Sequence, residues 1–168
     1  MPEDVEVDDY CRQLRPRLVG TLVLLLGDVG VAEEIAQETL ARVWLRWRQL
    51  ADLAEAARAA WACRVAVNLG RSWLRRRVAE RRALRRIGGR AEAVHVDPDT
   101  AEAVAVRRAV VALPRRQRTA VVLRFYTDLS VEEVAEVMGC APGTVKSLTH
   151  QGLRALRDQT RVEAEEHG

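Results

Sequence analysis

The sequence predicts an all-α fold of two small helical domains joined by a flexible linker, the second domain containing a helix-turn-helix. Ala, Leu, Arg and Glu dominate, and aromatic residues make up only 4% of the chain. Apolar residues recur at helical spacing, and one stretch, GGRAEAVHVDPDT, has no periodicity. With 168 residues, 48% of them hydrophobic, both domains can build a core. We expect an N-terminal domain over 1–87, a linker over 88–100, a C-terminal domain over 101–160 and a tail over 161–168.

In the first half, helical patterns follow an acidic leader. After residues 1–9, the first pattern runs from about Tyr10 to Leu26 and ends at the turn Gly27 to Gly30. A long amphipathic segment then extends to about Leu50. A third helix, from about Ala54 to Arg86, ends in a block of arginines.

In the second half, capping signals mark the helices. Asp99 or Thr100 can cap a helix that ends near Leu113, and Pro114 suits the first turn of the next helix, PRRQRTAVVLRFYT. Ser130 and Glu133 form a capping-box pattern at the start of SVEEVAEVM. Gly139-Cys140-Ala141 is a short turn, Pro142 begins the final helix, and the last residues, VEAEEHG, are expected to fray. Two helices around a three-residue turn are the pattern of a helix-turn-helix.

Several function classes lack their signals. The longest apolar run, LVLLL, cannot span a bilayer, and the acidic N-terminus does not resemble a signal peptide. The scattered Cys11, Cys63 and Cys140 form no CxxC pair, the three histidines lie far apart, and no phosphate-cradling, dinucleotide or nucleophile-elbow motif occurs. We therefore expect a cytoplasmic protein with reduced thiols, without membrane insertion, metal, cofactor or small-molecule substrate, and not an enzyme.

Positive charge is concentrated in one segment. Residues 61–90 hold ten arginines and one glutamate, hence a net charge of +9, which marks a candidate contact with a polyanion. Cations, an amide and a neighbouring aromatic ring are what a reader of single strands or flipped bases needs, although each residue alone also fits a solvated helix and the tryptophans also fit a core. The proposed outward stripe is Arg64, Asn68, Arg71 and Arg75 beside Trp61, and the inward stripe is Ala62, Val65, Ala66, Leu69 and Trp73.

The final helix has two different faces. In a helix-turn-helix, the exposed face of the second helix enters the major groove, and residues at its start suit phosphate contacts. An ordinary helical hairpin with a polar outer face is the alternative. The polar face carries Lys146, Ser147, His150, Gln151, Arg154 and Arg157, with Thr144 near the helix start, and the inward face carries Val145, Leu148, Thr149, Gly152 and Leu156.

The segment VAEEIAQETLARVW has a partly acidic face. Glutamates near a helix N-terminus are favoured by the helix dipole, and the same side chains would also suit a docking face for a basic partner, so both interpretations stay open here. We expect Glu34, Gln37, Glu38 and Ala41 to be presented together, with Ile35, Leu40, Val43 and Trp44 packed inward.

These three stretches, in this order, resemble the extracytoplasmic-function sigma factors, small bacterial transcription initiation factors. LLGDVGVAEEIAQETLARVW looks like their polymerase-docking helix, and AWACRVAVNLGRSWLRRR looks like the segment that opens and reads the minus-ten element. ALPRRQRTAVVLRFYTDLSVEEVAEVMGCAPGTVKS looks like the fourth region, which binds the minus-thirty-five element. The resemblance covers roughly Tyr10 to Asp158.

The resemblance implies partners and roles. The partners are core RNA polymerase, promoter DNA and an anti-sigma factor, which such factors commonly have. Asn68 would accommodate a base flipped from the non-template strand. The residues implied are Glu34, Gln37 and Glu38 for the polymerase; Trp61, Arg64, Asn68, Arg71, Ser72 and Arg75 for the minus-ten element; and Thr144, Lys146, Ser147, His150, Gln151 and Arg154 for the minus-thirty-five element.

The sequence differs from the family pattern at two positions, and two alternative functions stay open. The family often has an acid where Val31 stands and an arginine where Leu148 stands, so we expect no base contact from Leu148 and a different promoter sequence. The main rival is a stand-alone helix-turn-helix regulator that binds a palindrome as a dimer. An enzyme with helical packing is a more distant rival, because it would need a cluster of titratable groups.

Overall fold

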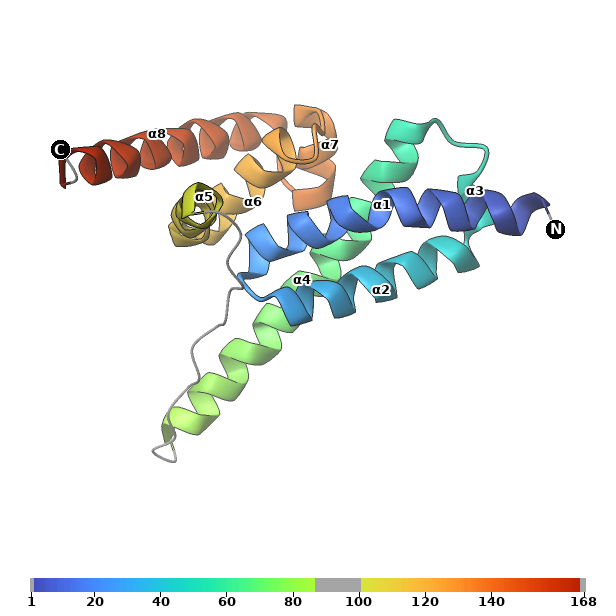
Figure 1. Cartoon of the computed structure of the whole chain (residues 1–168), viewed down its shortest axis with the longest axis horizontal. Coiled ribbons are helices and arrows are strands. Elements are labelled where there is room, and N and C mark those ends of the chain that lie inside the picture. The colour runs from blue at the N-terminus through green and yellow to red at the C-terminus, as the bar shows by residue number, and fades with distance from the viewer. Residues whose placement is uncertain (1, 87–100, 167–168) are drawn as a thin grey trace. The chain divides into compact units, whose positions relative to one another are not determined.

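The computed structural model describes residues 2–86 and 101–166 (Figure 1). Within these ranges every regular element is an α-helix, which confirms the predicted all-α class. Contacts between Cα atoms divide the chain into two units, Met1–Val96 and Asp97–Gly168, and each is described by itself below. The predicted linker at 88–100 lies outside the described residues. No described helix is long and apolar enough to cross a membrane.

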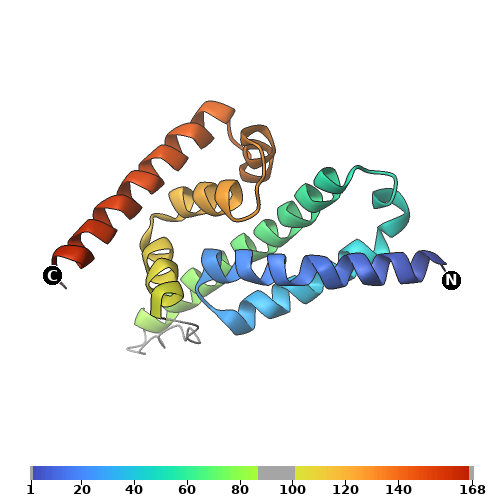
Figure 2. The ribbon, with the colours of Figure 1, turned by 45° about the horizontal axis from the view of Figure 1, so that its top comes forward.

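The described part of the first unit, residues 2–86, consists of three long helices and one short one. An antiparallel hairpin of α1 (Pro2–Leu26) and α2 (Val29–Leu45) packs on α4 (Glu55–Arg86), and α3 (Trp47–Leu50) connects α2 to α4 (Figures 1 and 2). Gly27 turns the chain with a φ of 75°, which glycine adopts without steric cost. The Asp28 side chain then caps α2 by accepting a hydrogen bond of 3.0 Å from the backbone N–H of Val31.

Close packing of small residues holds α4 against α1. Leu18 and Leu22 of α1 are fully buried, as are Ala62 and Ala66 of α4. A Cβ atom at Gly70 would lie 3.4 Å from the side chain of Leu26, so leucine side chains of α1 pack directly against the backbone of α4 at this position. The buried face of α4 therefore consists mainly of small residues, and the long side chains of α4 lie outside this face.

The predicted inward stripe of α4 was partly wrong. Ala62 and Ala66 are buried as expected, but the rest of the buried stripe consists of Ala59, Ala60, Cys63, Val67 and Gly70. Val65, Leu69 and Trp73 are only half-buried. The stripe is rotated because α4 packs on both α1 and α2, and the small side chains permit the closest approach to the two helices.

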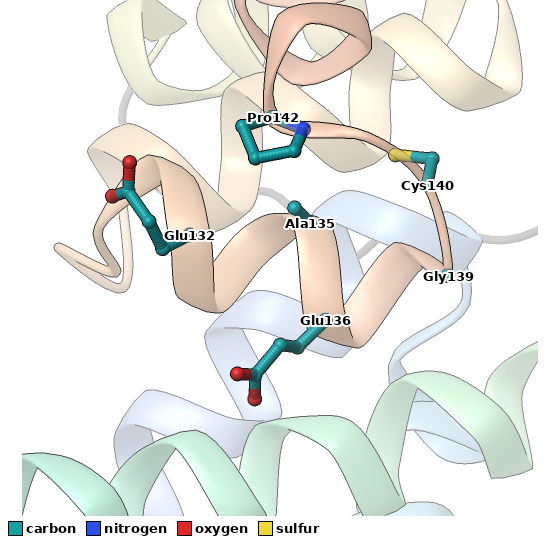
Figure 3. A pocket seen from close by; sticks show the side chains of 6 residues that line it. All are labelled: Glu132, Ala135, Glu136, Gly139, Cys140 and Pro142. Carbon is teal, nitrogen blue, oxygen red and sulfur yellow. The ribbon is translucent and has the colours of Figure 1, made fainter.

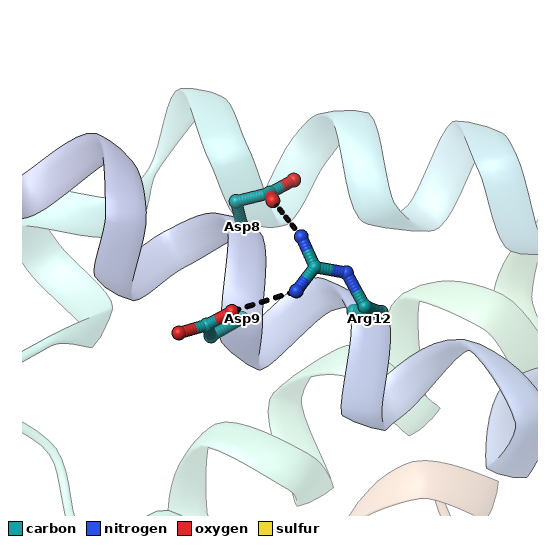
Figure 4. Close-up of polar contacts among 3 residues, drawn as sticks. All are labelled: Asp8, Asp9 and Arg12. Atoms are coloured by element: carbon teal, nitrogen blue, oxygen red, sulfur yellow. Dashed lines mark hydrogen bonds and ion pairs between the residues drawn. The ribbon is translucent and has the colours of Figure 1, made fainter.

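Three other predictions for this unit also need correction. The acidic leader is part of α1, because the helix begins at Pro2 and Val7 is buried. Arg12 forms ion pairs with both Asp8 and Asp9 one turn earlier (Figure 4), a spacing that supports a helix. The segment predicted as one helix to Leu50 is interrupted at Arg46. Trp44, predicted to pack inward, is 45% exposed.

Between residues 101 and 166, the second unit contains four helices: α5 (Ala101–Ala112), α6 (Arg115–Phe125), α7 (Val131–Met138) and α8 (Pro142–Glu166). The capping box at Ser130 is confirmed, because its hydroxyl accepts from the Glu133 N–H at 3.1 Å and the Glu133 carboxylate accepts from the Ser130 N–H at 2.7 Å. Gly139 ends α7 in the left-handed conformation, with a φ of 62°. Pro142 begins α8, as predicted, and α8 continues through the region expected to fray as far as Glu166.

A glycine sets the contact between α6 and α8. A Cβ atom at Gly152 would lie only 2.6 Å from Cγ2 of Val121 and 3.5 Å from Cβ of Gln117. Val121 is itself buried, and its branched side chain has little freedom to move aside. The absence of a side chain at Gly152 thus lets α8 lie directly on α6, and this contact positions the polar face of α8.

Two glycines of α8 provide a matched test of this contact. We expect Gly152→Ala to lower the free energy of unfolding, because overpacking costs about 1–3 kcal/mol and outweighs the gain in helix propensity of up to about 1 kcal/mol. Gly143→Ala is the control, because a Cβ atom there meets nothing within 4 Å, and it should stabilise the protein. Urea unfolding of both variants measures the difference, and equal stabilisation by the two alanines would contradict the close contact.

Candidate nucleic-acid and protein interfaces

The exposed face of α2 carries the residues predicted to dock a partner. Glu34, Gln37, Glu38 and Ala41 are all exposed, whereas Ile35 is buried on the opposite side, with Ala36, Thr39 and Val43. Glu38 forms an ion pair of 2.5 Å with Arg42 along the same helix, and such exposed pairs contribute little stability. The structure therefore presents the four side chains on one surface, as predicted.

The helix boundary decides one of the questions that the sequence leaves open. Because α2 begins at Val29 and has no acidic residue in its first turn, Glu34 and Glu38 lie beyond the turn in which the dipole acts strongly. Dipole complementarity thus does not explain the acids. The same surface continues into the exposed Trp44 and into Leu45, which is 82% exposed. A purely periodic reading of the sequence missed both side chains.

The basic face of α4 is partly exposed. Asn68 and Arg75 are exposed, and Arg64, Arg71 and Ser72 are half-buried. The Arg75 guanidinium donates a hydrogen bond of 3.1 Å to the Ser72 hydroxyl, so these two predicted site residues are linked. From residue 71 to residue 83, the last with a described side-chain environment, α4 contributes no buried residue but carries six arginines and one glutamate.

Both tryptophans of this segment lie beside a guanidinium. The Arg46 guanidinium carbon is 5.8 Å from the ring centre of Trp61, and that of Arg77 is 5.6 Å from the ring centre of Trp73. Both rings are half-buried, so neither is the core residue that the alternative interpretation required. Sequence reasoning missed Arg46, because its contact with Trp61 depends on how α3 returns the chain to α4.

The polar face of α8 is exposed as predicted. Val145 and Gly152 are buried, Leu148 and Thr149 are half-buried, and so is Thr144 at the helix start. The amide of Gln151 has two partners, because its oxygen accepts from Nε2 of Gln117 at 3.2 Å and its nitrogen donates to the Ser147 hydroxyl at 3.3 Å. The exposed predicted residues are Lys146, Ser147, His150, Gln151 and Arg154.

A shallow depression of about 470 Å³ lies beside the turn of the helix-turn-helix (Figure 3). Carboxylates on its rim would repel phosphate, so this side of α7 does not suit DNA. No group of three or more His, Cys, Asp or Glu side chains within the described residues can hold a metal ion. The lining residues are Glu132, Ala135, Glu136, Gly139, Cys140 and Pro142.

The perturbed titratable groups lie in structural contacts. Burial raises the pKa of Tyr10, against the opposing charge of Arg58, whose guanidinium carbon lies 5.2 Å from the Tyr10 ring centre and 5.4 Å from that of Trp47. Burial also lowers the pKa of Arg118, which donates to the Leu113 carbonyl at 3.1 Å and thereby supports the end of α5. The pKa shifts of Tyr10 and Arg118 therefore arise from packing and do not mark a catalytic site.

Two known families match the chain in this order. Sigma-70 region 2 matches residues 11–82, which include the faces of α2 and α4, and Sigma-70, region 4 matches residues 103–156, which include the helix-turn-helix. The helical fold with these two regions defines a transcription initiation factor of the sigma-70 class.

Relatives along nearly the whole chain narrow this class. The RNA polymerase sigma-E factor of Streptomyces coelicolor is 31% identical over 163 residues, which cover 95% of this chain and 88% of the relative. The ECF RNA polymerase sigma factor SigW of Bacillus subtilis is 30% identical over 82% of this chain and 79% of its own. The sigma factor RpoE of Bartonella quintana, solved in complex with the anti-sigma factor NepR, has the same fold, with a TM-score of 0.78, 24% identity and coverage of 94% of this chain and 98% of its own.

The chain belongs to the extracytoplasmic-function sigma factors of RNA polymerase. Its function is to direct promoter recognition with RNA polymerase. The family is not an enzyme class. Because the chain matches sigma factors along nearly its whole length, it is not a stand-alone helix-turn-helix regulator.

Proposed function

We propose that the three exposed faces divide the work of initiation among them. The α2 face, formed by Glu34, Gln37 and Glu38, binds core polymerase. The α4 face captures and melts the minus-ten element, and the α8 face reads the minus-thirty-five element. The observation that carries this proposal is the second half of α4, which carries six exposed or half-buried arginines and contributes no buried side chain from residue 71 to residue 83. A helix with this charge gains most from a polyanion.

On the α4 face, charge and readout belong to different residues. Arg64, Arg71 and Arg75 attract phosphates, with Ser72 held to Arg75, and Trp61 offers a ring for stacking. The short amide of Asn68 can hydrogen-bond the Watson–Crick edge of a base that has left the stack. On the α8 face, Thr144 and Ser147 suit phosphates at the helix start, and Lys146, His150, Gln151 and Arg154 are left for base edges and neighbouring phosphates.

Regulation and location follow from the partners. The relative from Bartonella quintana was solved with an anti-sigma factor, and we propose that a protein of this kind also controls the present chain. The polymerase performs the chemistry, so the chain itself needs no catalytic group. Because bacterial polymerase works in the cytoplasm, we expect the protein to act there.

The docking role of α2 can be tested by charge reversal. We expect Glu34→Lys combined with Glu38→Lys to abolish binding to core polymerase with unchanged helicity, because an acidic face should oppose a basic surface on its partner. Glu33→Lys is the control, because Glu33 lies on the same helix but faces Arg15 of α1 at 3.5 Å. Pull-down of core polymerase measures binding, and wild-type recovery by the double variant would rule out this role.

Asn68 separates melting from docking. We expect Asn68→Ala to bind polymerase and occupy the upstream element but to open the duplex poorly, because the flipped base loses a partner worth about 1–3 kcal/mol. Glu80→Ala, also exposed on α4, is the control and should open the duplex normally. Permanganate footprinting of the holoenzyme on duplex promoter measures the opening, and wild-type reactivity of the downstream thymines in Asn68→Ala would show that Asn68 is only a solvated helix residue.

Lys146 and Gln151 should control the choice of upstream element. Alanine at either position should lower initiation at the cognate promoter and relax its upstream base preference by about 1–3 kcal/mol, since both side chains are exposed on the outer face of α8. Arg157→Ala, further along α8, should lower initiation without changing the preference. Transcription from a set of promoter variants is the measurement. Identical preferences in mutant and wild type would refute the assignment.

A further inference from the structure

A side chain outside the helix-turn-helix holds one of its proposed base-reading residues. Gln117 lies in the first turn of α6, where Nε2 donates a hydrogen bond of 3.2 Å to Oε1 of Gln151 on α8. Nε2 of Gln151 in turn donates to Oγ of Ser147 at 3.3 Å, one turn earlier on α8. The result is a relay of three side chains, Gln117 to Gln151 to Ser147, which runs from α6 to the exposed face of α8.

The relay uses only part of the hydrogen-bonding capacity of the Gln151 amide. A primary amide has two N–H donors and two lone pairs on its oxygen, and the relay uses one of each. One donor and one acceptor remain on an exposed side chain. This is the pair that binds adenine in the major groove, because the N–H donates to N7 and the oxygen accepts from N6.

The helix contact brings Gln117 to this position. Since Gly152 has no side chain, α8 lies close enough to α6 for a Cβ atom at position 152 to come within 3.5 Å of both Cβ and the carbonyl oxygen of Gln117. Gln117 is half-buried in this contact, whereas Gln151 is exposed. An exposed glutamine otherwise loses rotamer freedom when it binds DNA, and a partner that already holds it reduces this cost.

We propose that Gln117 is a positioning residue for promoter recognition, which orients the Gln151 amide so that it prefers adenine at one position of the upstream element. The inference rests on the proposed base-reading role of Gln151. It adds a specificity determinant that lies on α6, outside the helix-turn-helix, and acts through another side chain. Anchoring of one glutamine should contribute about a two- to tenfold preference for the correct base.

Two substitutions at Gln117 test the direction of the relay. Gln117→Leu keeps most of the volume but removes the donor, so we expect the adenine preference to fall about two- to tenfold. Gln117→Glu offers only acceptors, so Gln151 must turn its NH2 group toward position 117 and its oxygen toward the Ser147 hydroxyl. This exchanges the donor and the acceptor that face the groove, and the preferred base should change.

The experiment uses the full chain with core polymerase and a promoter library that carries all four bases at each upstream position. Gln151→Ala should abolish the preference at one position, and Gln117→Leu combined with Gln151→Ala should match Gln151→Ala alone, because Gln117 acts through Gln151. Gln159→Leu, two turns further along α8, is the control and should preserve the preference. Thermal unfolding shows whether each variant is folded. If Gln117→Leu does not fold, Gln117→Glu still tests the positioning role.

The possible results separate this inference from the function on which it rests. If Gln151→Ala changes the preference but neither Gln117 variant does, the positioning role is overturned and the role of Gln151 stands. If Gln117→Leu lowers initiation equally from all promoters, Gln117 serves only the fold, and the inference is again overturned. An unchanged preference in Gln151→Ala would overturn the proposed readout and the inference together.

Discussion

The close packing of α4 against α1 determines which side chains of the first unit can reach a partner. Ala62, Ala66 and Gly70 form a buried stripe of small residues on α4, and Gly70 lies against the side chains of Leu22 and Leu26 of α1. At this contact, the large apolar side chains come from α1. Burial of unpaired guanidinium groups would be very costly, and the buried stripe of α4 accordingly contains no arginine. The same stripe therefore stabilises the unit and leaves the basic face of α4 open.

In the second unit, a single glycine allows the close packing of two helices. Gly152 lets α8 lie on α6, and Val145 anchors the start of α8 in the core. Long polar side chains, including Lys146, His150 and Arg154, then occupy the exposed face of α8 without being needed for packing. In both units, small residues pack on one face of a helix and polar residues occupy the other, so the residues proposed to contact the promoter lie outside the core.

Local signals in the sequence predicted much of this arrangement, whereas contacts between distant residues were not predictable. The capping box at Ser130 and the helix start at Pro142 depend only on neighbouring residues, and both were found where the sequence placed them. Trp44 was predicted to be buried, because helical periodicity gives a direction but does not say whether a partner lies there. The Arg46–Trp61 and Gln117–Gln151 contacts join different helices, and no spacing along the chain encodes them.

Charged and uncharged polar side chains have different roles on the faces proposed to contact the promoter. Arginines bind phosphates of any sequence, and their contribution falls as salt rises because counterions compete. Phosphate contacts of this kind position the protein on DNA but do not distinguish one promoter from another. Discrimination must come from groups whose hydrogen bonds are directional and few, and the amides of Asn68 and Gln151 fit this requirement. An amide reads a base only if its two ends are oriented correctly, so the residues that hold it belong to the readout as much as the amide itself. The proposed role of Gln117 therefore implies that promoter choice can change through a residue outside the helix-turn-helix.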